Sequence, residues 1–320
     1  MYTHFQYLNS VPLKQKWTCF FFINQLRLIH GVRNMNWIQS LQASIDYIED
    51  HLLEDIEITN VAKQAMVSPF HFQRMFGLLT GMPVGEYIRR RRLTLAAHEL
   101  VKEDVKIIDA ALKFGYNTPE SFSKAFRKQH GLSPREAKSG KGKLHYYHRL
   151  VIQVTLRGET PMKVEVIEKG SVQVVGIRQE VSCADGENSR EIPKIWGRVN
   201  QDGTADSLAS INNGEIKGVL GICVDKSKDK PDTIDYWVAA AHEGDRPERF
   251  ETMELPASKW AVFEVRGAMP HAIQTMWNRI YTEWFPASNY KHAGTPDLEV
   301  YSGGDPMSEE YISEIWIPVK

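Results

Sequence analysis

Two copies of one pattern constrain this chain more than any other feature. The first copy is VAKQAMVSPFHFQRMFGLLTGMP at residues 61–83, and the second is AALKFGYNTPESFSKAFRKQHGLSP at residues 110–134. Their landmarks pair at a constant offset of fifty residues: Ser68 with Thr118, Phe72 with Phe122, Arg74 with Lys124, Phe76 with Phe126, and Gly81 with Gly131. Because internal repetition fixes the architecture, we expect two similar supersecondary units.

Each copy is typical of a helix, a tight turn and a second helix. Ser68 suits the N-cap of the second helix, and Pro69 suits its first position, where a missing N–H has no consequence. Phe72 and Phe76 are one turn apart and therefore share a buried face. The second copy repeats this arrangement with Thr118, Pro119, Phe122 and Phe126.

The remaining polar side chains predict a surface that reads DNA. A recognition helix contacts base edges in the major groove with its N-terminal residues, and Gln and Arg match adenine and guanine. The expected contacts, near the exposed start of each second helix, are Phe70, His71, Gln73 and Arg74 in the first unit and Glu120, Ser121, Ser123 and Lys124 in the second. Two ordinary helical hairpins with solvated faces are the alternative, which the matched caps, aromatic pairs and glycines disfavour.

The segment between the copies, VGEYIRRRRLTLAAHEL at residues 84–100, has helical apolar spacing. Such a linker helix would hold the two recognition helices about one DNA turn, roughly 34 Å, apart. We expect Arg89 and Arg91 of its arginine run to reach phosphates. The alternative is a solvated helix face on which some of these arginines pair with nearby carboxylates.

Charge is divided unevenly along the 320 residues, a length that suggests two domains. Residues 36–143 carry sixteen basic and thirteen acidic side chains, a net charge of +3, whereas residues 144–320 carry nineteen basic and twenty-seven acidic, a net charge of −8. A basic half suits phosphates. The three cysteines lack metal-ligand spacing and indicate free thiols in a reducing compartment, and no apolar stretch is long enough to span a membrane.

Three further segments complete the first part of the chain. Residues 1–36 are expected to be an N-terminal extension, either poorly ordered or a misassigned start, and the apolar run WTCFFFI within them is too short for a membrane span. Residues 37–137 form the predicted all-α domain, whose first helix is amphipathic through Trp37, Leu41, Ile45 and Ile48. Residues 138–144, with KSGKGK, read as a flexible linker.

In residues 145–320 the sequence pattern changes from helical to that of short strands rich in β-branched residues. The first signs are the alternation of Ile152, Val154 and Leu156 and the segment KVEVIE. VQVVGI, EIPKIWGRV, GVLGICV and DYWVAA then form one β-α-β-β pattern, and WAVFEV, HAIQTMWNRIYTEWF, DLEVYSG and SEIWIPV form a second. Trp196 and Trp277 occupy matching helical places. The fold class is therefore multidomain: a double helix-turn-helix domain followed by an α+β domain of two pseudo-symmetric repeats.

A groove between the two repeats is the expected ligand site. Strand alternation along DLEVY places Glu299 and Tyr301 on one face and Leu298 and Val300 on the other, and along SEIWIPV it places Glu314 with Trp316, opposite Ile315 and Ile317. A carboxylate among aromatic rings suits a lipophilic cation. The candidate ligand contacts are Glu299, Tyr301, Trp277, Tyr281, Trp284 and Trp237. The alternative is that these aromatics form ordinary core, and Glu314 could face solvent at a strand end, which leaves Glu299 as the better pocket candidate.

Residues 37–137 resemble the DNA-binding domain of AraC/XylS-type transcription regulators, through the Ser-capped helix with its Arg-x-Phe ending, TGMP, YIRRRRL and the second unit that ends in GLSP. The resemblance implies base contacts by Phe70, Gln73 and Arg74. It implies the same for Glu120, Ser121, Ser123 and Lys124, although Pro119 and Glu120 depart from the usual polar residues. Residues 145–320 resemble the GyrI-like effector-binding domain through EWFPASNY, PDLEVY and EIWIPV, which implies that Glu299 lies in its ligand pocket.

These features predict a cytoplasmic transcription regulator, most simply an activator, that binds promoter DNA, RNA polymerase and a small amphipathic or cationic effector as a monomer or weak dimer. We expect no cofactor, metal, membrane partner or catalytic residue. One alternative is a GyrI-like hydrolase of reactive small molecules, in which Glu299 activates water beside Tyr281 or Trp284. Another is a protein-binding module.

Overall fold

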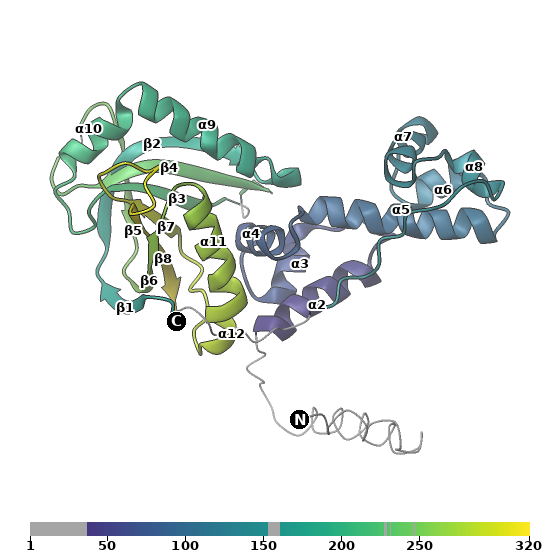
Figure 1. Cartoon of the computed structure of the whole chain (residues 1–320), viewed down its shortest axis with the longest axis horizontal. Helices are drawn as coiled ribbons and strands as arrows, with labels where there is room; N and C mark the ends of the chain where they lie inside the picture. Colours follow the sequence, from purple (N-terminus) through teal and green to yellow (C-terminus); the bar gives the residue numbers. More distant parts are fainter. Residues whose placement is uncertain (1–36, 153–160, 227–228, 231, 246) are drawn as a thin grey trace, which may run out of the picture. The chain divides into compact units, whose positions relative to one another are not determined.

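The structure is a computed structural model that describes residues 37–152, 161–226, 229–230, 232–245 and 247–320 (Figure 1). The predictions for residues 1–36, and for Val154 and Leu156 as strand residues, lie outside the described residues. Trp37–Lys320 form one compact unit. Among the described residues, no helix combines the length and the apolar character that crossing a bilayer requires.

The helical half contains both predicted helix-turn-helix units (Figure 1). Its helices are α2 (Trp37–Asp50), α3 (Ile58–Ala65), α4 (Pro69–Thr80), α5 (Val84–Lys102), α6 (Ile107–Lys113), α7 (Pro119–His130) and α8 (Pro134–Lys138). The first unit is α3–α4, the second is α6–α7, and α5 joins them, which confirms the predicted duplication.

The ends of α4 and α7 show why the two units fold alike. The side chains of Ser68 and Thr118 each accept a hydrogen bond from the backbone N–H three residues ahead, at 3.3 and 3.1 Å. Each helix then ends at a glycine with left-handed φ, 70° at Gly81 and 76° at Gly131, a conformation that glycine adopts without strain. The predicted caps and terminal glycines are confirmed.

The other half is an eight-stranded antiparallel sheet with the order β1-β6-β8-β7-β3-β4-β2-β5. Its strands are β1 (Val164–Lys169), β2 (Val172–Ser182), β3 (Val219–Asp225), β4 (Thr233–Ala241), β5 (Glu251–Leu255), β6 (Ser258–Arg266), β7 (Asp297–Tyr301) and β8 (Ile312–Val319). Its helical segments are η1 (Ala184–Gly186), α9 (Asn188–Gln201), α10 (Thr204–Ile211), α11 (His271–Arg279), η2 (Ile280–Trp284) and α12 (Phe285–Ala287). The predicted repeats appear as β2-α9-β3-β4 and β6-α11-β7-β8. The prediction lacked α10 and β5.

The two faces of the sheet have different neighbours. One face carries Trp237, Trp260, Trp316 and Leu298 in a single buried cluster that also includes residues of the outermost strands, so the sheet curls around this core. On the other face, α9 and α10 cover β2, β3 and β4, while α11 and η2 cover β6 and β8. The boundary between these two helical covers falls over β7.

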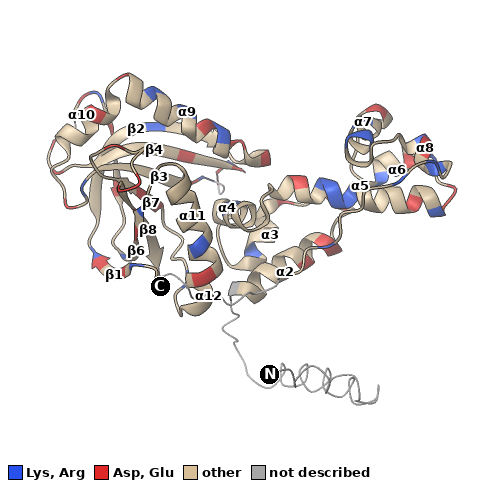
Figure 2. Ribbon diagram, in the orientation of Figure 1, with Lys and Arg blue, Asp and Glu red and all other residues tan. Residues whose placement is uncertain are grey.

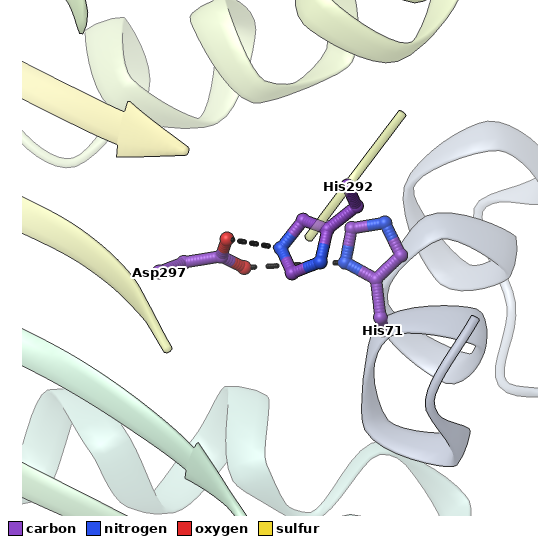
Figure 3. Close-up of side chains that lie close together, drawn as sticks. All are labelled: His71, His292 and Asp297. Atoms are coloured by element: carbon purple, nitrogen blue, oxygen red, sulfur yellow. Dashed lines mark hydrogen bonds and ion pairs between the residues drawn. The ribbon is translucent and has the colours of Figure 1, made fainter. Parts of the chain in front are cut away.

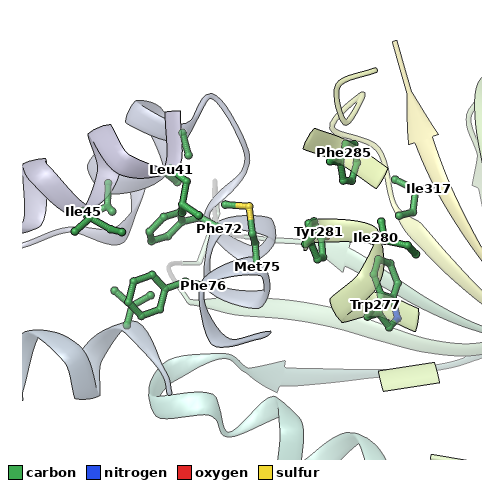
Figure 4. Close-up of a cluster of buried hydrophobic side chains, with 14 of the residues drawn as sticks. Leu41, Ile45, Phe72, Met75, Phe76, Trp277, Ile280, Tyr281, Phe285 and Ile317 are labelled. Carbon is green, nitrogen blue, oxygen red and sulfur yellow. The ribbon is translucent and has the colours of Figure 1, made fainter. Parts of the chain in front are cut away.

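One hydrophobic core joins the first helix-turn-helix unit to the second β-α-β-β repeat. It includes Phe72, Met75 and Phe76 of α4 together with Trp277 and Tyr281 of the sheet half (Figure 4). The second helix-turn-helix unit has a separate core around Phe122 and Phe126. The first unit is therefore packed as part of the sheet half, and the second is not.

The chain between the two halves remains attached to the helical half through Ile152. The backbone N–H groups of Tyr147, Leu150 and Ile152 donate to side chains of Thr94, Tyr87 and Gln42 respectively. Ile152 lies outside any strand, so the strand predicted to begin there is wrong at that residue. Alternating apolar residues satisfied the strand pattern, but here their backbone bonds to helix side chains.

We predict that Met75→Ala destabilises the sheet half although Met75 lies in a helix-turn-helix unit. Truncating a buried methionine costs about 2–5 kcal/mol of unfolding free energy. Six of the eight tryptophans lie between Trp196 and Trp316, so tryptophan fluorescence reports mainly on the sheet half. In a urea titration, the fluorescence transition of Met75→Ala should therefore have its midpoint at a lower urea concentration than that of wild type.

Leu100→Ala is the matched control, because Leu100 is equally buried but belongs to the separate core of the second unit. It should shift the far-ultraviolet circular dichroism transition and leave tryptophan fluorescence in place. A fluorescence midpoint unchanged in Met75→Ala would contradict the shared core.

Candidate functional site

The site is built on β7, at the boundary between the helices of the two repeats. Glu299 pairs with Gly221 of β3 on one side and Ile315 of β8 on the other. Residues opposite each other in a sheet share a face, and Ile315 packs beneath α11. Glu299 and Tyr301 therefore point to the helix-covered face, whereas Leu298 and Val300 are buried on the opposite face, as the alternation predicted.

Glu299 is held by aromatic donors. Its Oε1 accepts a hydrogen bond from Trp277 Nε1 at 2.8 Å, and its Oε2 accepts one from Tyr301 Oη at 2.9 Å. Trp277 comes from α11 of the second repeat, so one helix and one strand fix the carboxylate. The arrangement fits a prediction made from sequence, a carboxylate among aromatic rings.

The first repeat supplies further aromatic side chains near this carboxylate. Trp196 of α9 donates from Nε1 to Tyr236 Oη at 2.7 Å, and its ring meets Tyr301 edge-on with centroids 4.7 Å apart. Gly221 makes room for this pair, because a Cβ there would lie 2.5 Å from Tyr236 Oη. Sequence reasoning did not place Trp196 and Tyr236 in the site, although the match between Trp196 and Trp277 in the repeat was a usable signal.

The cation that contacts Glu299 is a side chain of α4. Arg74 Nη2 donates to Glu299 Oε1 at 2.9 Å, Nη1 lies 3.7 Å from Asp297 Oδ2, and Cζ lies 3.6 Å from the centre of the Trp277 ring. Burial alone lowers the pKa of Arg74, but neighbouring groups, of which Glu299 has the largest effect and Asp297 is one, outweigh it and raise the pKa above its ordinary value. The guanidinium is therefore a charged, buried ligand of the sheet half.

The other predicted base contacts of the first unit are also turned toward the sheet half. Phe70 is 6% exposed and packs in the apolar cluster beneath α9. Gln73 donates from Nε2 to Asp232 Oδ1 at 3.0 Å. The expectation that Phe70 and His71 are exposed is wrong, because an apolar and aromatic helix face finds a buried partner whenever a complementary surface is available.

His71 joins a compact cluster with His292 and Asp297 (Figure 3). His292 Nε2 lies 2.7 Å from Asp297 Oδ1, and His71 Nδ1 lies 4.0 Å from Asp297 Oδ2. The backbone N–H of Gly294 donates to His292 Nδ1, so in the neutral ring the proton is on Nε2 and points at Asp297. Although the three residues are close enough to hold a metal ion, this tautomer describes a hydrogen-bonded pair of His292 and Asp297 with His71 beside it.

The predicted DNA contacts of the second unit have the opposite environment. Glu120, Ser121 and Lys124 are exposed on α7, and Ser123 is half-buried. The arginine run of α5, coloured blue in Figure 2, consists of half-buried residues. Arg91 makes a two-pronged ion pair with the buried carboxylate of Glu49, at 2.7 and 2.8 Å, so the structure contradicts its prediction as a free phosphate contact.

Arg89 is the more accessible of the two predicted phosphate contacts, with a side chain 41% exposed and paired with Glu86.

The predicted ligand contacts have different surroundings. Tyr281 stacks on Trp277 with centroids 6.0 Å apart. Trp237, however, lies on the far face of the sheet in the inner core, so the structure contradicts its place in the groove. Trp284 stacks on Tyr290 instead of reaching Glu299.

We predict that acid loosens this site through His71. Burial, and next the neighbouring His292, lower its pKa from 6.5 to about 3, while Asp297 acts in the opposite direction and Arg74 in the same one. Because the folded pKa lies below the unfolded pKa, the contribution to stability is complete above pH 6.5 and is lost as pH falls toward 3. The loss is at most about 1.4 kcal/mol per pH unit.

Chemical unfolding at pH 7 and pH 5 measures this loss, with His71→Phe as the comparison. The variant retains the neighbouring Asp297, His292 and Tyr281, so the contributions of these groups to the pH dependence should be the same in the variant and in wild type and should cancel when the two are compared. We expect wild type to lose more stability than His71→Phe across this interval, and equal losses would show that His71 does not set the acid response.

Comparison with known proteins agrees with both halves of this architecture. Residues 162–320 match the family described as GyrI-like small molecule binding domain, and residues 61–139 match the helix-turn-helix domain family. The HTH-type transcriptional activator AarP of Providencia stuartii is 35% identical over 112 residues, which cover 35% of this chain and 83% of AarP. Regulatory protein SoxS of Salmonella typhimurium is 37% identical over 116 residues, which cover 36% of this chain and 100% of SoxS.

A solved structure of SAV2435 bound to tetraphenylphosphonium is 29% identical, with a TM-score of 0.45, and the match covers 50% of this chain and 94% of that one. The matches to AarP and SoxS cover about a third of this chain, and residues 162–320 match the small molecule binding family. The chain therefore belongs to the AraC-type helix-turn-helix family of DNA-binding transcription regulators and carries a GyrI-like small molecule binding domain.

Proposed function

We propose that this regulator senses a small lipophilic cation in the Glu299 pocket. The observation that carries the proposal is the guanidinium of Arg74, which lies on the face of Trp277 and against Glu299. A pocket that solvates one organic cation by a carboxylate and an aromatic face has the chemistry to take another. Tyr301, Tyr236 and Trp196 extend the aromatic wall around it.

The charge of the pocket favours a cation over a neutral ligand. Asp297 and Glu299 point from the same face of β7, and their side chains are only 4% and 18% exposed. Burial raises the pKa of Asp297, but His292 and other neighbours outweigh it and hold the pKa below its usual range, so this carboxyl is ionised. Two buried carboxylates without a cation would be costly.

For DNA, the proposal assigns base reading to α4 through Gln73 and Arg74, and to α7 through Ser121 and Lys124. The duplicated caps present both helices by the same local geometry, and AarP, a relative of the helical half, is named an activator. Activation of transcription by contact with RNA polymerase is accordingly the proposed output.

Catalysis is not part of the proposal. A general base needs a lone pair directed at a water or a substrate proton. Glu299 instead accepts hydrogen bonds from Trp277, Tyr301 and Arg74, which engage both of its oxygens. This carboxylate is arranged to bind a positive charge.

We predict that Glu299→Gln weakens binding of tetraphenylphosphonium, measured by isothermal titration calorimetry on the full chain. Losing a charged partner in a buried site costs about 1.5–3 kcal/mol, which corresponds to roughly tenfold to a hundredfold in Kd. Glu314→Gln is the matched control, because Glu314 also accepts from a tryptophan, Trp316, but on the other face of the sheet. Equal affinity of wild type and Glu299→Gln would remove Glu299 from the site.

We also predict that Lys124 contacts DNA. A duplex selected by the full chain from a random library provides the target, and fluorescence anisotropy gives its affinity at several salt concentrations. If Lys124 contacts a phosphate, Lys124→Ala should weaken binding and reduce the salt slope by about one. Lys259→Ala, an exposed lysine of β6 in the sheet half, should have no effect; an unchanged slope in Lys124→Ala would contradict the assignment.

A further inference from the structure

We infer that Arg74 is an internal ligand of the Glu299 pocket, and that a cationic effector and the docked helix α4 compete for this one site. Effector binding would then displace Arg74 and free α4 to read DNA. The inference rests on the proposed function, since it requires a cation pocket and a DNA-reading α4. It adds the physical link between the two.

Competition follows from the position of the guanidinium. Arg74 Cζ lies 3.6 Å above the Trp277 ring and its Nη2 lies 2.9 Å from Glu299 Oε1. A second cation cannot occupy the same ring face at that distance while Arg74 is present. The side chain of Arg74 is only 14% exposed, so the pocket is filled rather than merely covered.

Docking also removes the DNA-reading face of α4 from solution. Phe70 and His71 are buried, and Gln73 and Arg74 bond to Asp232 and Glu299 of the sheet half. A recognition helix must present these N-terminal residues to the base edges of the major groove. In the docked arrangement, α4 therefore cannot enter the groove.

Acidic side chains of the sheet half take the place that DNA acceptors would occupy. Besides Asp232 and Glu299, Asp185 of η1 approaches α5 so closely that a Cβ on Gly85 would lie 2.9 Å from its Oδ1. A surface hollow of about 410 Å³ beside this contact is lined by residues that include Gln73, Arg89, Arg92, Asp185 and Asp232. Basic and amide groups suited to DNA thus face carboxylates of the other half.

The charges explain why an effector is needed to open the contact. Withdrawing Arg74 would leave Glu299 and Asp297 on one face of β7 without their cation, which is unfavourable. An entering cation replaces the guanidinium at the ring face and the carboxylate. Because it binds only when Arg74 has left, it shifts the population toward the undocked state.

The second unit lacks this contact. Lys124 is the counterpart of Arg74 in the repeat, yet it is exposed on α7. The competition therefore controls one of the two DNA-reading helices, α4. The other helix, α7, stays accessible whether or not an effector is bound.

The first test removes the internal competitor. Tetraphenylphosphonium is titrated by calorimetry into the full-length wild type, Arg74→Ala and Lys128→Ala, whose exposed lysine on α7 makes it the control. Because the docked state reduces the fraction of protein able to bind, we expect Arg74→Ala to bind at least tenfold more tightly than wild type, and Lys128→Ala to match wild type. Arg74→Ala with wild-type or weaker affinity would overturn the inference.

The second test needs no effector. Hydrogen exchange measured by mass spectrometry follows the backbone amides of α4 and α7 in the full chain. Glu299→Gln removes the ionic anchor of Arg74, so exchange in α4 should accelerate several-fold while exchange in α7 stays constant. Glu314→Gln, on the other face of the sheet, should leave the exchange of both helices unchanged. If the protection of the α4 amides is the same in Glu299→Gln as in wild type, the inference is overturned.

The two tests separate this inference from the proposed function. If Glu299→Gln weakens the probe and Arg74→Ala does not tighten it, the cation site stands and the competition fails. If tetraphenylphosphonium binds neither wild type nor any variant, the proposed sensing of such cations fails. The hydrogen exchange of α4 then decides by itself whether Arg74 holds this helix against the sheet half. Faster α4 exchange in wild type upon addition of tetraphenylphosphonium supports both.

Discussion

The ion pair between Arg74 and Glu299, stacked on Trp277, is the interaction on which the arrangement of the two halves depends. Its partners come from residues 225 positions apart in the chain. Each is costly to bury alone, so neither half can form this surface in isolation without exposing its charge to water. Apolar contact then surrounds the pair, because Met75 and Tyr281 lie in one core with Phe72 (Figure 4).

The proposed competition would couple the effector domain to DNA binding without a long path of intermediates. In that proposal Arg74 both fills the ligand pocket and reads DNA, so the coupling between the two sites is direct exclusion. A coupling free energy requires that a ligand distinguish two states. In the proposed mechanism the two states differ in whether Arg74 or the effector supplies the cation that pairs with Glu299.

The sequence predicted those features that depend on spacing alone. Caps at Ser68 and Thr118, and the face of β7 that carries Glu299, follow from local geometry and periodicity. It did not predict features that depend on what a side chain meets in space. Arg91 was predicted to contact a phosphate, but it pairs with Glu49, which is distant in sequence. Trp237 was predicted to line the ligand groove, but the register of β4 places it in the inner core.

The two helix-turn-helix units differ where docking is decided. At the two positions after the proline, the first unit has Phe70 and His71, and the second has Glu120 and Ser121. Phe70 packs beneath α9 and His71 against Tyr281 and His292, whereas a carboxylate and a hydroxyl there would be buried without such partners. These two positions, together with Gln73, Arg74 and Met75, thus distinguish the helix that packs against the effector domain from the helix that is left in solvent.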